Sequence, residues 1–154
     1  MSQRYWLFKS EPNTYSFADL ERDGSTMWDG VRNYQARNFM RDEVQEGDGV
    51  LFYHSVVKPM AVVGLAKVVR EAYPDPTQFE RKSPYFDAKA TAEAPRWVLV
   101  DIAYDRALPT PVTLERIKGE KQLADMPLIN RSRLSIQPVT AAQWRQIVKL
   151  GGLA

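Results

Sequence analysis

Apolar residues along the chain concentrate in three stretches that have the character of β-strands. These stretches are rich in β-branched and aromatic residues, and Gly, Pro or Asp bounds each of them. The predicted strands are Tyr5–Lys9, Gly49–Tyr73 with the segments Val50–Tyr53 and Ala61–Val63, and Trp97–Tyr104 with the core Val98–Ile102.

Two helices are predicted between these strands. Ser16 can cap a short helix that begins at Phe17, and Asp19 then lies near the positive end of that helix. Between residues 33 and 46, apolar residues recur at four-residue spacing, which predicts an amphipathic helix. Its apolar positions are Ala36, Met40 and Val44.

A third helix, near the end of the chain, has the clearest start signal. Thr140 and Gln143 form a capping box, and Gly151 ends the helix. Trp144 shares one helical face with two aliphatic residues, so we assign it to the core and not to a binding site.

Strands interleaved irregularly with short helices predict an α+β domain, because the order does not repeat a βαβ unit. The length of 154 residues is that of one ordinary domain, and a hydrophobic content of 44% is enough for a core. We therefore expect a single domain over residues 1–154.

Composition narrows the chemistry. The 21 Lys and Arg residues exceed the 19 Asp and Glu residues by only two, so an anionic partner has to meet a local basic patch. The sequence has no cysteine and one histidine, which excludes Cys/His zinc sites, iron–sulfur clusters, disulfides and thiol nucleophiles. It contains no signal-peptide pattern and no apolar run of about 18 residues. We expect a soluble, intracellular protein without a membrane partner.

Two groups of basic residues are candidates for binding an anion. Asn33, Arg37 and Arg41 follow one another at four-residue spacing on the second predicted helix. Residues 130–149 contain no acidic side chain, and their loop Arg131–Arg133 is of a kind that often contacts phosphate. The alternatives are a solvated basic face for the first group and opposite faces of the molecule for the two.

Several aromatic residues do not fit a regular element. Trp28 lies between a turn and a glycine and matches neither a helical stripe nor a strand alternation, which indicates the wall of a pocket. Four more occupy a Pro-rich connection, where they either stack on a planar ligand or pack the loop onto the sheet. These four are Tyr73, Phe79, Tyr85 and Phe86.

Signals of catalysis are weak. His54 and Ser55 are neighbours at a strand end and point to opposite faces, which argues against a nucleophile–base pair. Glu11 and Asp87 can supply an acid, but no nucleophile elbow, phosphate-binding loop or paired-carboxylate signature accompanies them. The sequence therefore favours binding over catalysis.

Four blocks of the sequence resemble the EVE domain family, in order and over nearly the whole chain. They are YWLFKSEP at 5–12, WDGVRNYQARN at 28–38, FYHS at 52–55 and RLSIQPVT at 133–140. The resemblance implies a PUA-like fold, which is a small, strongly bent mixed β-barrel with peripheral helices. Because the first block begins almost at the start of the chain, without a basic extension, we expect a bacterial-type, cytoplasmic protein.

EVE domains are similar to YTH domains, which read methylated adenine in RNA, and are themselves implicated in recognising modified cytosine in DNA. Lys9–Ser10 resembles the Lys-Ser pair of YTH domains, Trp28 their first cage tryptophan, and residues 130–137 their phosphate-contacting loop. Leu134 stands where YTH domains have an acidic residue that touches the base, which weighs against adenine. Their second cage tryptophan has no clear counterpart, and its candidate replacements are Phe79, Tyr85 and Phe86.

The resemblance implies a non-catalytic reader, in which a nucleotide leaves the helix and its base slides against Trp28. Ser10 and Asn33 offer donors and acceptors to the base edge, and Glu11 can accept from the exocyclic amine of cytosine. The expected base-binding residues are Lys9, Ser10, Glu11, Trp28, Val31, Asn33, Tyr53, His54, Ser55, Phe79 and Phe86. The expected phosphate-binding residues are Arg32, Arg37, Arg131, Ser132, Arg133 and Ser135.

The expected partner is nucleic acid, with DNA favoured over RNA, and we expect a monomer with no cofactor and no metal ion. One alternative is an RNA-binding module. Another is an enzyme that acts on a modified base or nucleotide, with Glu11 or His54 as general acid or base. For the reader, Trp28→Ala is expected to weaken binding by about 1–3 kcal/mol without loss of the fold.

Overall fold

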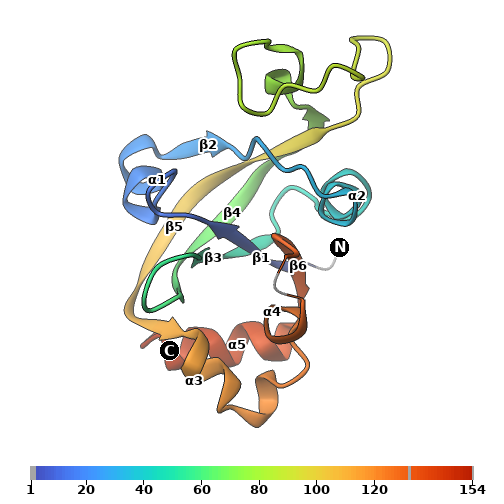
Figure 1. The fold of residues 1–154 in the computed structure, drawn as a ribbon. Helices are drawn as coiled ribbons and strands as arrows, with labels where there is room; N and C mark the ends of the chain where they lie inside the picture. The colour runs from blue at the N-terminus through green and yellow to red at the C-terminus, as the bar shows by residue number, and fades with distance from the viewer. Residues whose placement is uncertain (1–2, 132, 154) are drawn as a thin grey trace.

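The computed structural model describes residues 3–131 and 133–153, and its centre is a six-stranded mixed sheet (Figure 1). The hydrogen-bonded strand order is β2-β5-β4-β3-β1-β6. β1 and β3 are parallel, and every other neighbouring pair is antiparallel. The strands are β1 (Tyr5–Ser10), β2 (Ser25–Met27), β3 (Gly49–His54), β4 (Ala61–Pro74), β5 (Val98–Thr113) and β6 (Ile136–Val139).

Short helices surround the sheet, which confirms the α+β prediction. α1 (Phe17–Asp23) and α2 (Tyr34–Asp42) precede β3, and the 3₁₀ helix η1 (Pro76–Phe79) follows β4. The remaining helices lie together below the sheet in Figure 1 and are α3 (Leu114–Lys118), the 3₁₀ helix η2 (Lys121–Leu123), α4 (Pro127–Asn130) and α5 (Ala141–Leu150). Within the described residues, no helix is long and apolar enough to cross a membrane.

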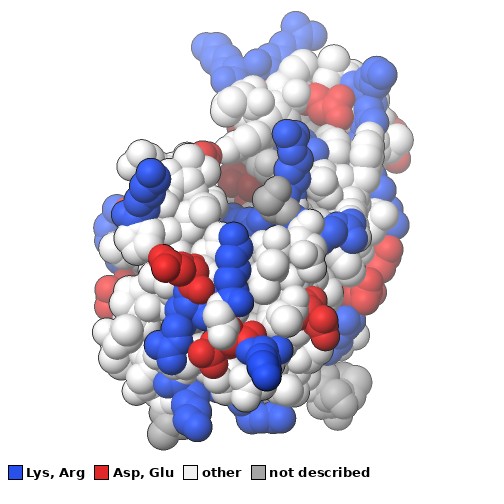
Figure 2. All heavy atoms as spheres, turned by 60° about the horizontal axis from the view of Figure 1, so that its bottom comes forward, with Lys and Arg blue, Asp and Glu red and all other residues white. Residues whose placement is uncertain are grey.

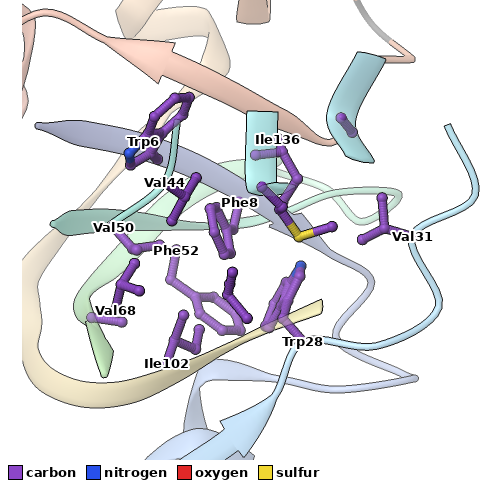
Figure 3. Packing of buried hydrophobic residues seen from close by; sticks show 14 of the residues in the cluster. Trp6, Phe8, Trp28, Val31, Val44, Val50, Phe52, Val68, Ile102 and Ile136 are labelled. Carbon is purple, nitrogen blue, oxygen red and sulfur yellow. The ribbon is translucent and has the colours of Figure 1, made fainter. Parts of the chain in front are cut away.

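Side chains of the central strands alternate between two apolar cores, one on each face of the sheet. In β1, Trp6 and Phe8 enter the first core, whereas Leu7 enters the second. β3 follows the same alternation and is buried on both faces, so its sequence is an apolar run without polar interruptions. Figure 3 shows the first core, in which Trp28 lies beside Phe52.

The two cores are closed by different helices. α1, α2 and the loop after β2 cover the first core, to which they contribute Leu20, Met40 and Trp28. α3, η2, α4 and α5 cover the second core. Trp144 of α5 packs against this second core, as predicted, and stacks on Tyr5 with 4.5 Å between the ring centroids.

The two longest strands bend the sheet. The register of β4 against β5 shifts at several bulges or irregularities, between residues 62 and 73 of β4. A bulge increases local twist and bends the strand that carries it. Both strands curve strongly in Figure 1, as expected from the resemblance.

Proline explains why the end of β5 and the whole of β6 were absent from the prediction. β5 continues to Thr113 although Pro109 and Pro111 interrupt its apolar pattern. β6 contains Pro138 and lies at the edge of the sheet, where a residue without a backbone N–H is tolerated. Its apolar positions pair with β1 and not with the strands nearest to it in sequence.

The predicted helix over residues 33–46 is shorter in the structure and ends at Asp42. A buried carboxylate, that of Asp48, redirects the chain after it. Asp48 Oδ2 accepts hydrogen bonds from the N–H of Gln45 and from the indole N–H of Trp6, both at 2.9 Å. These bonds fix a turn before β3 in place of another helical turn.

The predicted cap at Ser16 and the predicted capping box at Thr140 are both present, and Ser16 forms a capping box as well. The hydroxyl of Ser16 accepts from the N–H of Asp19, and that of Thr140 accepts from the N–H of Gln143. Gly151 is the C-cap of α5, also as predicted. Local sequence therefore determines where these helices begin and where the last one ends.

The irregular segment 75–97 projects from one end of the sheet in Figure 1. The fully buried amide of Gln78 holds its two ends together. Gln78 donates to the carbonyls of Asp75 and Trp97 at 2.8 Å and accepts from the N–H groups of Arg96 and Trp97 at 2.9 Å. The segment is thus attached to the sheet at a fixed position.

Candidate functional site

A cavity of about 750 Å³ opens where β1 and β3 end. These strands are parallel, so Lys9 and Ser10 lie at the same edge of the sheet as Tyr53, and the N–H of Ser55 donates to the carbonyl of Ser10 at 2.9 Å. The volume is within the range of small-molecule sites, about 300–1,000 Å³. The lining residues are Lys9, Ser10, Glu11, Thr14, Tyr15, Thr26, Met27, Trp28, Asp29, Gly30, Val31, Arg32, Tyr53, Ser55, Val56, Met60, Tyr85, Leu114, Leu128, Arg133 and Ser135.

The cavity receives side chains from both cores. Trp28 and Val31 belong to the first core, whereas Tyr53 and Leu128 belong to the second. Its apolar walls are therefore held by the packing of the whole molecule and not by loops alone.

Trp28 is both a cavity wall and a core residue. It is 8% exposed, and its ring centroid lies 5.4 Å from those of Phe8 and Phe52, with the Phe52 ring edge-on (Figure 3). Tyr15, which also lines the cavity, meets the indole edge-on at 6.5 Å. Truncation of a buried tryptophan to alanine costs about 3–5 kcal/mol of stability. Trp28→Ala is therefore expected to lower stability as well as binding.

Tyr85 is the aromatic residue of segment 75–97 that reaches the cavity. Its ring lies against Gly30, where an added Cβ would be 2.6 Å from Tyr85 Cζ. Gly30 also has a φ of 78°, which favours glycine. The other two candidates, Phe79 and Phe86, are exposed and do not line the cavity.

The loop after Trp28 is tied to this segment through the buried carboxylate of Asp75. Asp75 Oδ2 accepts from the N–H of Gly30 at 2.8 Å and from Nη1 of Arg32 at 3.1 Å, and Oδ1 accepts from the N–H of Thr77 at 2.8 Å. These donors supply the hydrogen bonds that a buried carboxylate requires. Asp75 thus fixes the position of two cavity residues.

Arg32 was expected to contact phosphate, but in the structure its guanidinium is hydrogen-bonded to other residues of the protein. Besides Asp75, its five N–H groups reach the carbonyls of Val31 and Tyr85 and the hydroxyl of Thr77, at 2.7–3.2 Å. A guanidinium has five N–H donors in all. Arg32 therefore positions the cavity loop and keeps no donor for a ligand.

Two acidic side chains line the cavity, Glu11 and Asp29. Burial raises the pKa of the Asp29 carboxyl above its usual value, the negative charge of Asp75 raises it further, and Arg32 opposes both. Among the described residues, neither Glu11 nor Asp29 has an ion pair or a side-chain hydrogen bond with another residue. Both carboxyl groups are therefore available to a ligand.

Burial also shifts the pKa of two other cavity residues. It lowers the pKa of the Lys9 amine and raises the pKa of Tyr53 to about 12. The Tyr53 hydroxyl is thus protonated at neutral pH and can donate a hydrogen bond.

The basic rim of the cavity is narrower than expected. Arg133 and Ser135 line the cavity, whereas exposed Arg131 lies outside its lining and donates to the Oε1 atom of Gln35 at 2.5 Å. Ser132 is outside the described residues. On the face shown in Figure 2, Lys and Arg side chains are interspersed with Asp and Glu.

The basic helix face also has a structural role. The guanidinium of Arg37 donates to the Oδ1 atom of Asn38 and to the carbonyl of Arg96, and lies 4.7 Å from the ring centroid of Tyr34. Asn33 is the N-cap of α2, and its Oδ1 accepts from the N–H of Ala36 at 2.9 Å. Neither Arg37 nor Asn33 lines the cavity.

His54 is not part of the cavity lining either. Its Nε2 atom accepts a hydrogen bond from the N–H of Phe17 at 3.0 Å, at the first residue of α1. Burial lowers the pKa of the imidazole below its usual value, which favours this neutral acceptor. His54 therefore anchors a helix and lies outside the cavity lining in which it was expected.

Sequence reasoning missed several residues that line the cavity. Asp29 lies within the block at 28–38, directly after Trp28, and Tyr15 follows the block at 5–12 by three residues, so the available signal was their nearness in sequence to these blocks. Met27, Val56 and Met60 form an exposed apolar rim, for which loop and edge-strand sequences have no periodic signal. No group of three potential metal ligands occurs in the part of the chain that the structure describes.

Comparison with known proteins identifies close relatives. The EVE domain model matches residues 4–150. Thymocyte nuclear protein 1 of Mus musculus is 41% identical over 165 residues, which cover 95% of this chain and 73% of that protein. A hypothetical protein from Leishmania major has a TM-score of 0.94 at 45% identity, over 97% of this chain and 95% of that chain. The human THYN1 protein, solved in complex with 5-methylcytosine-containing DNA, has a TM-score of 0.93 at 37% identity over 99% of each chain.

These relatives correct one expectation and confirm two. The mouse, rat and human relatives are named nuclear proteins, so the expected cytoplasmic location is wrong and is not retained. The solved neighbours confirm a PUA-like α+β fold. Because the family model spans residues 4–150 and the mouse relative is 41% identical over the aligned region, the chain belongs to the EVE domain family.

Proposed function

We propose that this chain, as one EVE domain over residues 1–154, is a monomeric, non-catalytic reader of nucleic acid that accepts an extruded modified base in its cavity. The observation that carries the proposal is an aromatic-walled cavity in a chain that superimposes, with a TM-score of 0.93, on a protein solved with 5-methylcytosine-containing DNA. Modified cytosine in DNA is therefore the preferred ligand, and RNA is the alternative that the test includes.

Aromatic side chains supply the attraction for a planar base. Trp28, Tyr15, Tyr53 and Tyr85 all line the cavity, and the first three are held by the cores or by ring contacts. Stacking on an aromatic side chain contributes about 1–3 kcal/mol per base. That is comparable to the few kcal/mol needed to extrude a nucleotide, so further polar contacts have to favour binding.

The carboxyl groups of Glu11 and Asp29 are suited to recognise the exocyclic amine of cytosine. Thymine carries the same C5-methyl group as 5-methylcytosine but has a carbonyl acceptor where cytosine has an amine donor. A carboxylate accepts from the amine and repels the carbonyl, so it distinguishes two bases that a methyl pocket alone treats alike. The tyrosine hydroxyl of Tyr53 and the hydroxyl of Ser10 provide further contacts at the base edge.

Backbone contacts are assigned to the rim. Arg133 and Ser135 line the cavity, and exposed Arg131 is close to them in sequence. This supports assigning the three residues to phosphates that flank the extruded nucleotide. Lys9 lies deeper, where burial lowers the pKa of its amine. We assign it to the base or sugar and not to the rim.

No observation favours an enzyme. His54 hydrogen-bonds to the start of α1, and Glu11 has no nucleophile or base paired with it among the described residues. A general acid–base step needs a group within hydrogen-bond reach of the proton that it transfers.

The proposal is tested by titrating the chain with matched strands that carry 5-methylcytosine, cytosine or thymine at one position, as DNA and as RNA. We expect 5-methyl DNA to bind about fourfold more tightly than cytosine DNA, because one buried methyl contributes about 0.8 kcal/mol. Thymine should bind most weakly. Equal affinity for the three DNA strands contradicts the proposal. Tighter binding of the RNA strand would show that RNA is the ligand. Release of a free base, detected by mass spectrometry, would show that the protein is an enzyme and not a reader.

Matched variants locate the contact to the amine. Glu11→Gln and Asp29→Asn each replace a carboxylate by an amide, which can present either a donor or an acceptor. The variant that removes the true contact should lose the preference for 5-methylcytosine over thymine. Glu21→Gln, on the exposed surface of α1, is the control and should keep it.

A further inference from the structure

The loop between β3 and β4 contains a backbone conformation that its residue does not favour. Val56 has a φ of 65°, and it is the one non-glycine residue with a positive φ in the described parts of the chain. A β-branched side chain is among the least suited to this region, which glycine and asparagine tolerate. Strain of this kind persists where surrounding structure enforces it, and it concentrates at functional sites.

The free protein gains no compensating burial from this side chain. Val56 is 73% exposed, which makes it the most exposed of the large hydrophobic residues that the structure describes. Val56 is unfavourable in two respects, because its backbone conformation is strained and its apolar side chain is exposed to water. A polar residue would fit the same position better. The combination indicates that the side chain is covered only in a complex.

The position of the loop is nevertheless well defined. At one end, the N–H of Ser55 donates to the carbonyl of Ser10 at 2.9 Å, and at the other, the N–H of Leu114 donates to the carbonyl of Met60 at 2.9 Å. Both bonds attach the loop to central strands or to the start of α3. Both ends of the loop that carries Val56 are therefore attached to regular elements by hydrogen bonds.

Val56 also lies at the cavity that the proposed function assigns to the base. It lines the cavity together with Met27 and Met60, and these two are exposed large hydrophobic residues as well. An apolar rim beside charged and hydroxyl-bearing residues is expected where the rim contacts stacked base pairs and not water.

We propose that Val56 is a wedge that enters the base stack at the place which the extruded nucleotide leaves. This inference rests on the proposed function, because it requires a base to occupy the cavity. Extrusion leaves a gap in the duplex, and an apolar side chain inserted between base steps replaces part of the lost stacking. Met27 and Met60 then pack against the exposed faces of the neighbouring base pairs.

The wedge has a consequence that a simple contact to the strand does not have. A side chain that fills a gap in a stack contributes to binding of a duplex, where the gap exists, and much less to binding of a single strand. The ratio of the two affinities therefore measures the wedge, independently of how well the cavity holds the base.

The experiment compares wild type with Val56→Gly and Val56→Asn, both of which suit a positive φ and so remain folded. Fluorescence anisotropy measures affinity for a duplex with one 5-methylcytosine and for the same methylated strand alone. We expect each variant to lower duplex affinity about tenfold more than single-strand affinity, in line with the burial of one valine side chain. Val69→Ala is the matched control, because Val69 is an exposed valine that does not line the cavity, and it should leave the ratio unchanged.

The outcomes separate the wedge from the proposed function. An unchanged ratio in both Val56 variants, with wild type binding the methylated strand, overturns the wedge and leaves the reader intact. A change equal to that in Val69→Ala overturns the wedge too. Failure of wild type to bind either methylated probe overturns the reader itself, whereas a selective duplex loss confined to the Val56 variants supports the wedge.

Discussion

Substitution of Gly30 by alanine tests how tightly the cavity wall is built. The added Cβ would lie 2.6 Å from Cζ and 2.7 Å from Cε2 of Tyr85, well inside van der Waals contact, and the φ of 78° adds backbone strain. The backbone cost is about 1–2 kcal/mol, and overpacking adds about 1–3 kcal/mol. We therefore expect Gly30→Ala to lose about 2–5 kcal/mol of the free energy of unfolding, measured by urea denaturation.

Gly24→Ala separates these two costs. Gly24 has nearly the same φ, 80°, but an added Cβ meets nothing within 4 Å. It should lose only the cost of a sparsely populated backbone conformation, about 1–3 kcal/mol. In a Tyr85→Ala background, the excess cost of Gly30→Ala should disappear, because the ring that causes it is gone.

The result that refutes this reasoning is an equal loss for Gly30→Ala and Gly24→Ala with Tyr85 present. An excess that persists without the Tyr85 ring contradicts it as well. If the Tyr85 ring shifts to make room for the added Cβ, the free energy of unfolding changes less but the cavity wall is displaced. Gly30→Ala should then weaken binding of the methylated strand, whereas Gly24→Ala should not.

Three further predictions concern charge. Burial lowers the pKa of His54 below 6.5, so the unfolded chain takes up a proton first, and stability should fall as the pH drops through 6.5 toward the folded-state pKa. Since the chain has one histidine, His54→Gln should flatten the melting temperature between pH 8 and about pH 5, and an unaltered slope contradicts the assignment. Burial raises the pKa of Asp29, so Asp29→Asn should raise the melting temperature at pH 7 by an amount that shrinks as the pH falls toward that pKa; a gain that grows instead refutes it. If Arg131 and Arg133 each neutralise one phosphate, affinity should fall about twelvefold from 50 to 200 mM salt, with a slope of about −1.8 that Arg133→Gln reduces to about −0.9.

The sequence predicted those parts of the fold that depend on local chemistry. Capping boxes at Ser16 and Thr140 involve residues three apart, so their helices were placed correctly. β6 was not predicted, because its partner β1 lies at the other end of the chain and Pro138 weakens its pattern. Pairing across such a distance is decided by the fold and leaves little trace in a short window.

The candidate site divides in the same way. Trp28, Ser10 and Glu11 belong to blocks that carry the family resemblance, and all three line the cavity. Arg32 belongs to such a block too, but its donors are used by carbonyls and by a carboxylate that lies some forty residues further along the chain. A sequence shows that an arginine is present, whereas only the fold shows whether its charge is already compensated.

The location of the cavity between the two cores couples ligand occupancy to the integrity of the molecule. An occupant that contacts Trp28 on one side and Tyr53 or Leu128 on the other connects the two cores and stabilises their packing. Any small molecule that binds only the folded chain raises its stability, by about 2.7 kcal/mol at a hundredfold excess over Kd. Thermal melting in the presence of individual modified nucleosides can therefore sort ligands for this cavity without a strand, a label or a prior choice between DNA and RNA.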